Sequence, residues 1–292
     1  MSITFKNIAL KNISIPNPNP PLPMSDMSFI YSLRRINPDY TGDAIRVRRT
    51  TPDSTEQDIG FDANGDLDEV ALLTFCGAGD GFVTIWYEQN QVSDFSISQT
   101  TTSQQPQIVD SGAVIKVNGR PSLAWSNANT TVLERASVSL TELINNEIGC
   151  AFFVLYQTVQ TSSFVFMHEP GSTSSRYSIS YPWDSSSIYW DAGSYFISRL
   201  TISGFSTITD QLIQGSCFRA GADMSVYANS SVLGTKSDAT GTPAWGSRTL
   251  YVGSNNSLSL DGYLSEIIFS NKELLGKRLL IETNQQDYYN IT

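Results

Sequence analysis

The chain has 292 residues, of which 40% are hydrophobic and only 16% are charged, so it can bury a large core in one or two domains. Its formal net charge is −10, and no basic stripe is long enough to follow a phosphate backbone, which argues against nucleic acid as a partner. Ser, Thr, Asn, Gln, Gly and aromatic residues predominate, as is typical of strands and turns, and they favour an all-β fold.

Residues 1–25 differ from the rest of the chain. Apolar residues recur in ITFKNIALKNISI, and the five prolines that follow are Pro16, Pro18, Pro20, Pro21 and Pro23. This pattern predicts a short strand and then a stiff, extended spacer, which would serve as an arm that attaches to another protein. An edge strand of the chain's own domain explains the same residues equally well.

The N-terminus has no uninterrupted apolar stretch and no small-residue cleavage site, so we predict no signal peptide. Nor does any apolar run approach the roughly 20 residues that span a bilayer. We therefore expect synthesis in a cytoplasm and no membrane insertion.

Residues 45–49 read as a strand in which Ile45 and Val47 alternate with arginines. Arg46 and Arg48 should share one face, where we expect them to pair with acidic residues of the same chain, for which the candidates are Glu56, Asp58 and Asp62. Recognition of an acidic sugar by these arginines is the alternative.

The stretch FDANGDLDEVALLTFCG predicts a turn followed by a helix. Asp66 or Asp68 is the candidate N-cap, and the apolar face is Ala71, Leu72 and Phe75. The spacing of the acidic residues from Asp62 onward also resembles a calcium loop, but no Glu stands at the closing position. A turn that caps the helix is the preferred interpretation.

From about residue 111 onward, short strands recur every ten residues or so, with Gly, Asn and Ser between them, and Asn118-Gly119 is a hairpin turn. This spacing predicts a β-sandwich or barrel. A C-terminal helix is expected with one apolar face, made of Leu274, Leu275, Leu279 and Ile281. We expect residues 26–292 to form a single domain.

Few residues suggest metal or nucleophilic chemistry. The three cysteines, Cys76, Cys150 and Cys217, are widely spaced and are expected to be buried free thiols. His168 is the single histidine, so no Ser-His or Cys-His pair can be assembled from the pattern, and a structural role is expected. We predict no metal and no cofactor.

Aromatic residues are more informative because an exposed ring can stack on the C–H face of a sugar. Several stand in polar surroundings such as SYPWDSSSIYWDAG, although half or more should fill the core. The set comprises Trp86, Tyr87, Trp125, Tyr181, Trp183, Tyr189, Trp190 and Trp245.

Two parts of the chain resemble known proteins. The runs YSLRRINPDYTGDAIRVRR, EQDIGFDANGDLDEVALLTFCGAGDGFVTIWYEQ and QPQIV resemble the N-terminal part of the catalytic domain of fungal-type α-L-arabinofuranosidase B, a block also found in phage and other viral proteins. The run LYVGSNNSLSLDGYLSEIIFSNKELLGKRLLIETNQQDYYNI resembles the last strands and terminal helix of a concanavalin-like or laminin-G-like jelly roll. Together they cover about half of the chain.

The resemblance implies an all-β, concanavalin-like β-sandwich with one or two short helices. Within it, residues 26–110 would be the arabinofuranosidase-like part and residues 111–292 the jelly-roll core.

The family's catalytic residues match this sequence poorly. Its chemistry needs two carboxylates, one as nucleophile and one as acid/base. At the nucleophile step, Trp190-Asp191-Ala192-Gly193 keeps an Asp but has Gly193 in place of Glu. At the acid/base step the chain reads Val252-Gly253-Ser254-Asn255-Asn256. The strand end corresponding to WYDQSG is Trp86-Tyr87-Glu88-Gln89-Asn90, and the family's vicinal cysteine pair is absent. These departures predict that the chain is not an enzyme.

We therefore predict a non-catalytic structural protein of a virion of bacteriophage type, either a capsid decoration protein or a fibre or tail component. Residues 1–25 would bind other virion proteins, the chain would form homo-oligomers, and host surface glycans are a possible ligand. The resemblance places the glycan site at Trp183, Tyr189, Trp190, Asp191 and Asn255. Two alternatives are a rigid spacer without a ligand and a glycoside hydrolase with displaced carboxylates from Asp184, Asp191 or Glu88.

Overall fold

The structure is a computed structural model of the chain. It describes residues 21–90, 95–159, 162–168, 175–183, 187–194, 197–204, 209–241, 246–254 and 257–292. Residues 1–20, most of the predicted arm, lie outside the described residues, as do Trp245 and Asn255.

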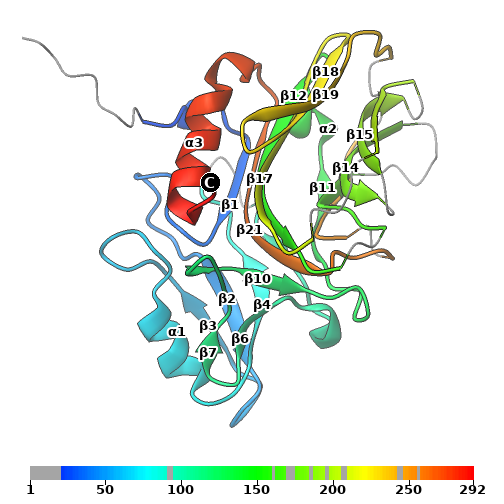
Figure 1. The fold of residues 1–292 in the computed structure, drawn as a ribbon. Coiled ribbons are helices and arrows are strands. Elements are labelled where there is room, and N and C mark those ends of the chain that lie inside the picture. The colour runs from blue at the N-terminus through cyan, green and yellow to red at the C-terminus, as the bar shows by residue number, and fades with distance from the viewer. Residues whose placement is uncertain are drawn as a thin grey trace, which may run out of the picture.

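Nineteen of the described strands are joined by hydrogen bonds into one continuous sheet that folds into layers. Six of these strands form a layer at the centre of the molecule, here called the first sheet (Figure 1). Its strands are β1 (Phe29–Ser32), β12 (Ile148–Gln157), β17 (Leu212–Ala220), β18 (Asp223–Ala228), β19 (Ser231–Lys236) and β21 (Gly262–Ser270). They run in the order β1–β21–β12–β17–β18–β19, and every pair is antiparallel.

Strand β12 shows why this sheet is apolar on both faces. Ala151, Phe153 and Leu155 point into the main core, whereas Cys150 and Phe152 belong to a second apolar cluster on the opposite face. An antiparallel sheet usually alternates apolar and polar residues because one face meets water. Here both faces are covered, so CAFFVL is a continuous apolar run.

A second sheet packs against the main-core face of the first. Its strands are β5 (Ile97–Ser98), β11 (Leu133–Val138), β13 (Phe166–His168), β14 (Ser175–Trp183), β15 (Ser187–Ser194), β16 (Arg199–Ser203) and β20 (Arg248–Val252). Their order is β5–β11–β20–β13–β14–β15–β16. Ring contacts such as Phe153–Tyr181 and Phe166–Phe269 join the two sheets. The predicted concanavalin-like β-sandwich is confirmed.

The remaining strands form a lower layer (Figure 1). They are β2 (Ile45–Arg49), β3 (Glu56–Ile59), β4 (Gly81–Trp86), β6 (Gln107–Asp110), β7 (Ala113–Val114), β8 (Lys116–Val117), β9 (Arg120–Pro121) and β10 (Leu123–Trp125). Strand β6 pairs with β10, β5 pairs with β11 and β1 pairs with β21, so residues on both sides of position 110 share hydrogen-bonded ladders. The division into 26–110 and 111–292 stays a prediction.

The described helices are α1 (Glu69–Cys76), α2 (Leu140–Leu143) and α3 (Arg278–Tyr289), with 3-10 turns at Met24–Asp26, Thr102–Gln104 and Leu275–Lys277. As predicted, the side chain of Asp68 caps α1 by accepting from the Ala71 N–H. Helix α2 was not predicted, although Ser139 and Glu142 form a capping box at its start. The predicted hairpin turn at Asn118-Gly119 joins β8 and β9, and both residues have positive φ.

Helix α3 covers the face of the first sheet opposite the second sheet (Figure 1). The predicted helix is present, but the prediction of its apolar face was partly wrong. Leu275 and Leu279 are 44% and 55% exposed, whereas Glu282 and Gln285 are fully buried beside Ile281. The helix therefore docks through a largely polar interface, which apolar spacing cannot reveal.

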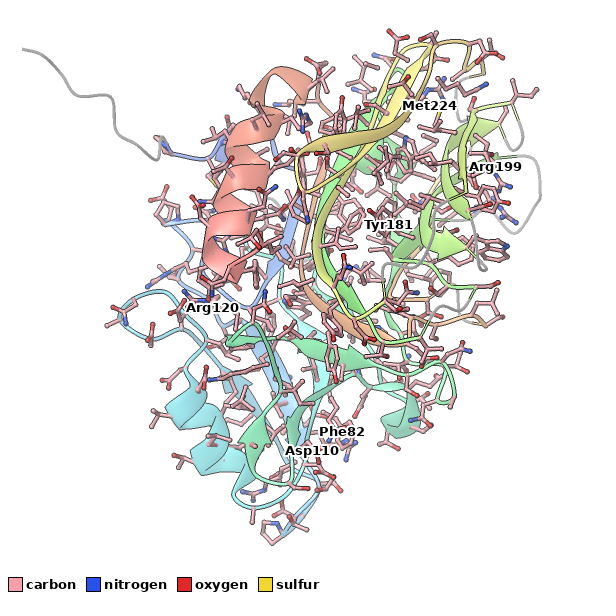
Figure 2. The ribbon with its side chains drawn as sticks, viewed as in Figure 1. Phe82, Asp110, Arg120, Tyr181, Arg199 and Met224 are labelled. Carbon is pink, nitrogen blue, oxygen red and sulfur yellow. The ribbon has the colours of Figure 1, made fainter. Side chains whose placement is uncertain are left out.

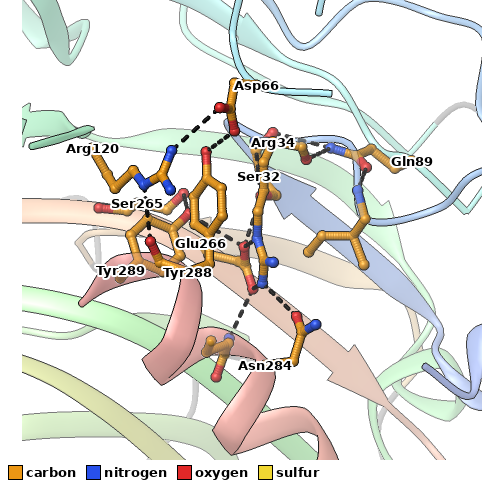
Figure 3. Close-up of polar contacts among 12 residues, drawn as sticks. Ser32, Arg34, Asp66, Gln89, Arg120, Ser265, Glu266, Asn284, Tyr288 and Tyr289 are labelled. Atoms are coloured by element: carbon orange, nitrogen blue, oxygen red, sulfur yellow. Dashed lines mark hydrogen bonds and ion pairs between the residues drawn. The ribbon is translucent and has the colours of Figure 1, made fainter. Parts of the chain in front are cut away.

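That interface is organised around Glu266 in the middle of β21 (Figure 3). The carboxylate is fully buried and accepts hydrogen bonds from the Ser32 hydroxyl at 2.8 Å and the Gln285 amide at 3.1 Å. The Arg34 guanidinium donates to both carboxylate oxygens, at 2.9 and 3.2 Å, and the Tyr289 hydroxyl donates at 3.2 Å. The proximity of Glu266 raises the pKa of Arg34 despite its burial. One carboxylate thus joins β1, β21 and α3.

The network continues toward the lower layer. The Tyr288 ring lies between two guanidinium groups, 4.4 Å from Arg34 and 4.1 Å from Arg120. The Tyr288 hydroxyl donates to Asp66 at 2.6 Å, and Arg120 pairs with the same carboxylate at 3.2 Å. Helix α3 is thereby fixed to the loop that precedes α1 (Figure 3).

The predicted roles of the cysteines and the histidine are confirmed. Cys76, Cys150 and Cys217 are buried and form no disulfide. His168 is fully buried, with its Nε2 atom 2.9 Å from the Val138 carbonyl oxygen. Burial lowers the pKa of His168 to about 4, so the ring is neutral at pH 7.

The part of the predicted arm that the structure describes packs against the domain. Leu22 and Met24 are partly buried against the apolar cluster between the first sheet and α3. Among the described residues, no helix is long and apolar enough to cross a membrane.

Replacing Arg34 with Met tests the network beneath α3. The change leaves the buried Glu266 carboxylate without its cation, so we expect the free energy of unfolding in urea to fall by about 3–5 kcal/mol. Arg46→Met is the matched control, because Arg46 and Asp58 form a similar pair with side chains 37% and 35% exposed. That change should cost at most about 1 kcal/mol. Equal losses in the two variants would contradict the assigned role of Glu266.

Candidate functional site

The candidate site lies on the outer face of the second sheet, over β14, β15 and β16. Along β14, Tyr177, Ile179 and Tyr181 point into the core, so the residues between them point outward. Along β15, Trp190 points inward and Tyr189 outward by the same alternation. Figure 2 shows Tyr181 between the two sheets and Arg199 on the outer side of the second.

A β-bulge brings Trp183 to this outer face. Ser180 pairs with Tyr189 and Trp183 pairs with Ser187, so β14 has one more residue than β15 between these two pairs. Strict alternation would point Trp183 into the core together with Tyr181. The extra residue reverses its direction, as bulges commonly do at functional surfaces.

The side chains that meet here surround a cavity of about 130 Å³, lined by Phe164, Arg176, Ser180, Trp183, Tyr189 and Arg199. The Trp183 ring contacts the Phe164 ring edge-on, with centroids 5.2 Å apart, and lies 6.4 Å from Tyr189. The Arg199 guanidinium lies 4.5 Å from the centroid of the Tyr189 ring. Two half-buried aromatic rings, a hydroxyl and two guanidinium groups thus face one small space.

Asp191 holds Arg199 in place. These residues are register partners on β15 and β16, and the Nε and Nη2 atoms of Arg199 each lie 2.7 Å from a carboxylate oxygen. The Asp191 side chain is only 2% exposed, and the Arg199 side chain is 14% exposed. This bidentate geometry fixes the plane of the guanidinium group.

The structure separates the residues that the resemblance grouped together. Trp183 and Tyr189 line the cavity, and Asp191 contacts it indirectly through Arg199. Trp190 was wrongly placed, because it is fully buried and its Nε1 donates to the Phe218 carbonyl at 3.0 Å. Asn255 lies outside the described residues.

Four cavity residues were not predicted: Phe164, Arg176, Ser180 and Arg199. The alternation in RYSISY would have placed Arg176 and Ser180 on one face, opposite Tyr177 and Ile179. Nothing in the sequence indicates that Arg199 pairs with Asp191, because that contact depends on the register of β15 and β16.

The arginines of β2 are satisfied within the chain. Arg46 binds Asp58 through two hydrogen bonds of 2.7 and 2.8 Å, which confirms the predicted internal pairing and lowers the pKa of Asp58. Arg48 donates instead to the Gln105 side-chain oxygen at 2.8 Å and lies 5.1 Å from the Phe82 ring centroid.

The acidic loop before α1 has structural contacts. Asp62 accepts from the N–H groups of Asn64 and Asp66 at 2.9 Å, and Asp68 caps the helix. In the described part of the chain, no group of three or more His, Cys, Asp or Glu side chains is placed to hold a metal ion.

Hydrolysis of a glycoside by this chain would require a second carboxyl group close to Asp191. The ladders of the second sheet place Glu134, Tyr251, Met167, Ser178 and Asp191 in one row. Glu134 and Asp191 are four strand spacings apart, roughly 19 Å at about 4.8 Å per spacing. Glycosidases hold their two carboxyl groups roughly 5–10 Å apart, so these two residues do not form such a pair.

The other proposed carboxylates do not supply a partner for Asp191 within the described residues. Glu88 is buried, and its Oε1 accepts from the backbone N–H groups of Ile30 and Asn90 at 3.0 and 2.6 Å. Asp184 lies outside the described residues.

No protein-family model and no curated protein matches this chain. Solved structures do resemble it. An arabinofuranosidase complexed with arabinofuranosyl-α-1,2-xylobiose has a TM-score of 0.65 and 12% identity, with 90% of this chain and 62% of that chain covered. A GH54 α-L-arabinofuranosidase mutant soaked with 4-nitrophenyl α-L-arabinofuranoside has a TM-score of 0.63 and 15% identity, with 84% and 59% covered. A GH54 α-L-arabinofuranosidase soaked with a cyclic sulfate inhibitor has a TM-score of 0.57 and 12% identity, with the same coverage.

These comparisons overturn one prediction. The chain was expected not to be an enzyme, yet three solved structures that match 84–90% of it with TM-scores of 0.57–0.65 are arabinofuranosidases. Identities of 12–15% show a shared fold and do not establish catalytic activity. The chain also spans only 59–62% of the length of these enzymes.

Proposed function

We propose that this protein binds carbohydrate in the cavity over β14, β15 and β16. The observation that carries the proposal is the pair of half-buried rings, Trp183 and Tyr189, beside the Ser180 hydroxyl and two guanidinium groups. Aromatic faces stack on the C–H faces of sugars, while hydroxyl and guanidinium groups bind sugar oxygens.

The size of the cavity limits what it can enclose. Its volume of about 130 Å³ is below the roughly 300–1,000 Å³ typical of pockets for drug-sized ligands. It therefore suits a single sugar ring, such as the end of a glycan, with the rest of the glycan outside.

A glycan panel with Trp183→Ala tests this proposal. Removal of the ring should weaken binding of any glycan that the wild type retains by at least about tenfold, or 1.4 kcal/mol. Tyr156→Ala is the matched control, because Tyr156 packs against Tyr263 in the apolar cluster beneath α3 and does not line the cavity. Binding that Trp183→Ala leaves unchanged, or silence across the whole panel, would refute the proposal.

A second candidate is a glycoside hydrolase of arabinofuranosidase type, which the similar structures favour. Asp191 would then be one of its carboxylates. The test is release of 4-nitrophenol from 4-nitrophenyl α-L-arabinofuranoside. For a hydrolase, Asp191→Asn should lower kcat by at least about a hundredfold. No turnover by the wild type, or turnover unaffected in a folded variant, would reject this assignment.

We further propose a setting for the chain, a virion of bacteriophage type in which it is a capsid decoration, fibre or tail component and a homo-oligomer. The Pro-rich residues 1–25 support this proposal as an attachment arm. Deletion of residues 1–20 leaves Leu22 and Met24 in their packed positions. The deletion should abolish incorporation of the chain into particles and leave glycan binding intact. Normal incorporation of the truncated chain would show that these residues are not an attachment arm.

A further inference from the structure

We infer that residues 1–15 of one copy of this chain bind in a pocket on a second copy. A lysine of that segment meets the Glu142 carboxylate, and apolar side chains of the segment cover the rings of Phe29 and Phe95. The inference goes beyond carbohydrate binding. It rests on the proposed attachment arm and names the surface to which the arm binds.

The pocket has a volume of about 280 Å³ and is lined by residues from the start of β1, from α2 and from the turn after β21. Its apolar part consists of Met27, Phe29 and Phe95. The Phe29 and Phe95 rings have centroids 4.8 Å apart, and Phe95 is half-buried. Contact with an apolar side chain would remove the remaining surface of these rings from water.

Asn90 and Asn271 bring hydrogen-bond acceptors to this pocket. The Asn90 amide donates to the Met27 carbonyl oxygen. The Asn271 amide donates to the Thr141 carbonyl oxygen at 2.7 Å. The side-chain oxygens of both amides accept no hydrogen bond from the described residues. A ligand that donates hydrogen bonds therefore fits here better than one that accepts them.

Glu142 adds a carboxylate that has no cation. Its Oε2 atom accepts from the Ser139 N–H at 3.0 Å, and burial raises its pKa without an offsetting cation among the described residues. Lys272 and Lys277, which follow β21, pair with Asp26 instead. An ammonium group that enters the pocket thus meets a half-buried carboxylate and aromatic rings together.

The N-terminal segment has the complementary chemistry. Residues 1–25 contain two lysines and no acidic residue, so they carry +2, and the rest of the chain carries −12 of the total of −10. Both lysines stand in the same short pattern, KNI followed by a further apolar residue two positions later, at Lys6 and at Lys11. Each lysine therefore has isoleucine and leucine side chains close by, as an apolar pocket with one carboxylate requires.

The position of the pocket favours a second copy over the arm's own chain. The sequence predicts a stiff spacer over residues 16–23, with a length of about 25 Å at roughly 3.1 Å per residue. Ser25, at the base of this spacer, lines the pocket itself. The spacer thus carries residues 1–15 away from the pocket of their own chain. A contact of this kind repeats from copy to copy and gives a ring or a filament.

Sedimentation equilibrium of the full chain tests the inference. We expect concentration-dependent self-association, which Glu142→Gln weakens at least about fivefold because the ion pair is lost. Glutamine can still serve in the capping box, so the start of α2 is retained. Glu134→Gln is the matched control and should leave the association unchanged. Glu134 on β11 is also half-buried with a raised pKa, but it does not line the pocket.

A complementation experiment identifies the two surfaces. One variant, Glu142→Lys, keeps the arm and loses the pocket. The other, Lys6→Gln with Lys11→Gln, keeps the pocket and loses the cations of the arm. We expect each variant to be monomeric alone and folded by thermal unfolding. Mixed in equal amounts, they should form a one-to-one dimer, because one variant supplies the arm and the other the pocket.

Three results would overturn the inference. One is a wild-type chain that stays monomeric, as an arm bound to its own chain would leave it. Another is self-association that Glu142→Lys does not weaken, and the third is a mixture of the two variants that forms no dimer. Particle incorporation that is lost on deletion of residues 1–20 but unaffected by Glu142→Lys would also overturn it, while the attachment arm would stand.

Discussion

The buried carboxylate of Glu266 is the constraint on which the arrangement of this protein depends. A carboxylate removed from water must be compensated by a cation and by hydrogen bonds, and here its partners come from two other segments of the chain. Arg34 follows β1, Ser32 ends β1, and Gln285 and Tyr289 lie on α3. We infer that this network determines where α3 docks, because few other positions of the helix would give all of these polar groups their hydrogen-bond partners.

The same strand also shapes the opposite side of the molecule. β21 pairs with β1 and β12 in the first sheet, and the face of that sheet opposite α3 packs against the second sheet, which contains β14 and β15. Trp190 contributes to this packing through its ring contact with Tyr177 and its hydrogen bond to the Phe218 carbonyl. Its neighbours Tyr189 and Asp191 face outward, so one strand serves both the core and the candidate site. Rigid strands hold binding residues more precisely than loops do.

Much of this fold could be predicted from local patterns. The hairpin at Asn118-Gly119, the cap at Asp68 and the pairing of Arg46 with an acidic neighbour each depend on residues close in sequence or on adjacent strands. The site could be predicted only in part. Alternation shows that Tyr189 and Trp190 face opposite sides, but only distant partners such as Phe218 decide which side is the core.

Two further features could not be read from the chain. Pro182 stands between Ser180 and Trp183, and a proline within a sheet is confined to edge strands and bulges, but that rule does not say which way the next side chain points. The face of α3 was misassigned because a buried polar network, and not apolar spacing, determines which residues are covered. The expectation that the chain is not an enzyme rested on mismatches to a motif, whereas the fold is shared with arabinofuranosidases.

The most direct test of the proposed cavity is a ¹H–¹⁵N spectrum of the tryptophan indole groups, recorded during titration with the glycan that binds best. The chain has five tryptophans, and each gives one indole signal that can be assigned by single substitution. We predict that the Trp183 signal shifts with saturation, whereas those of the buried Trp86 and Trp190 change little. A saturable titration in which the Trp183 signal stays in place would show that carbohydrate binds elsewhere and would contradict the account.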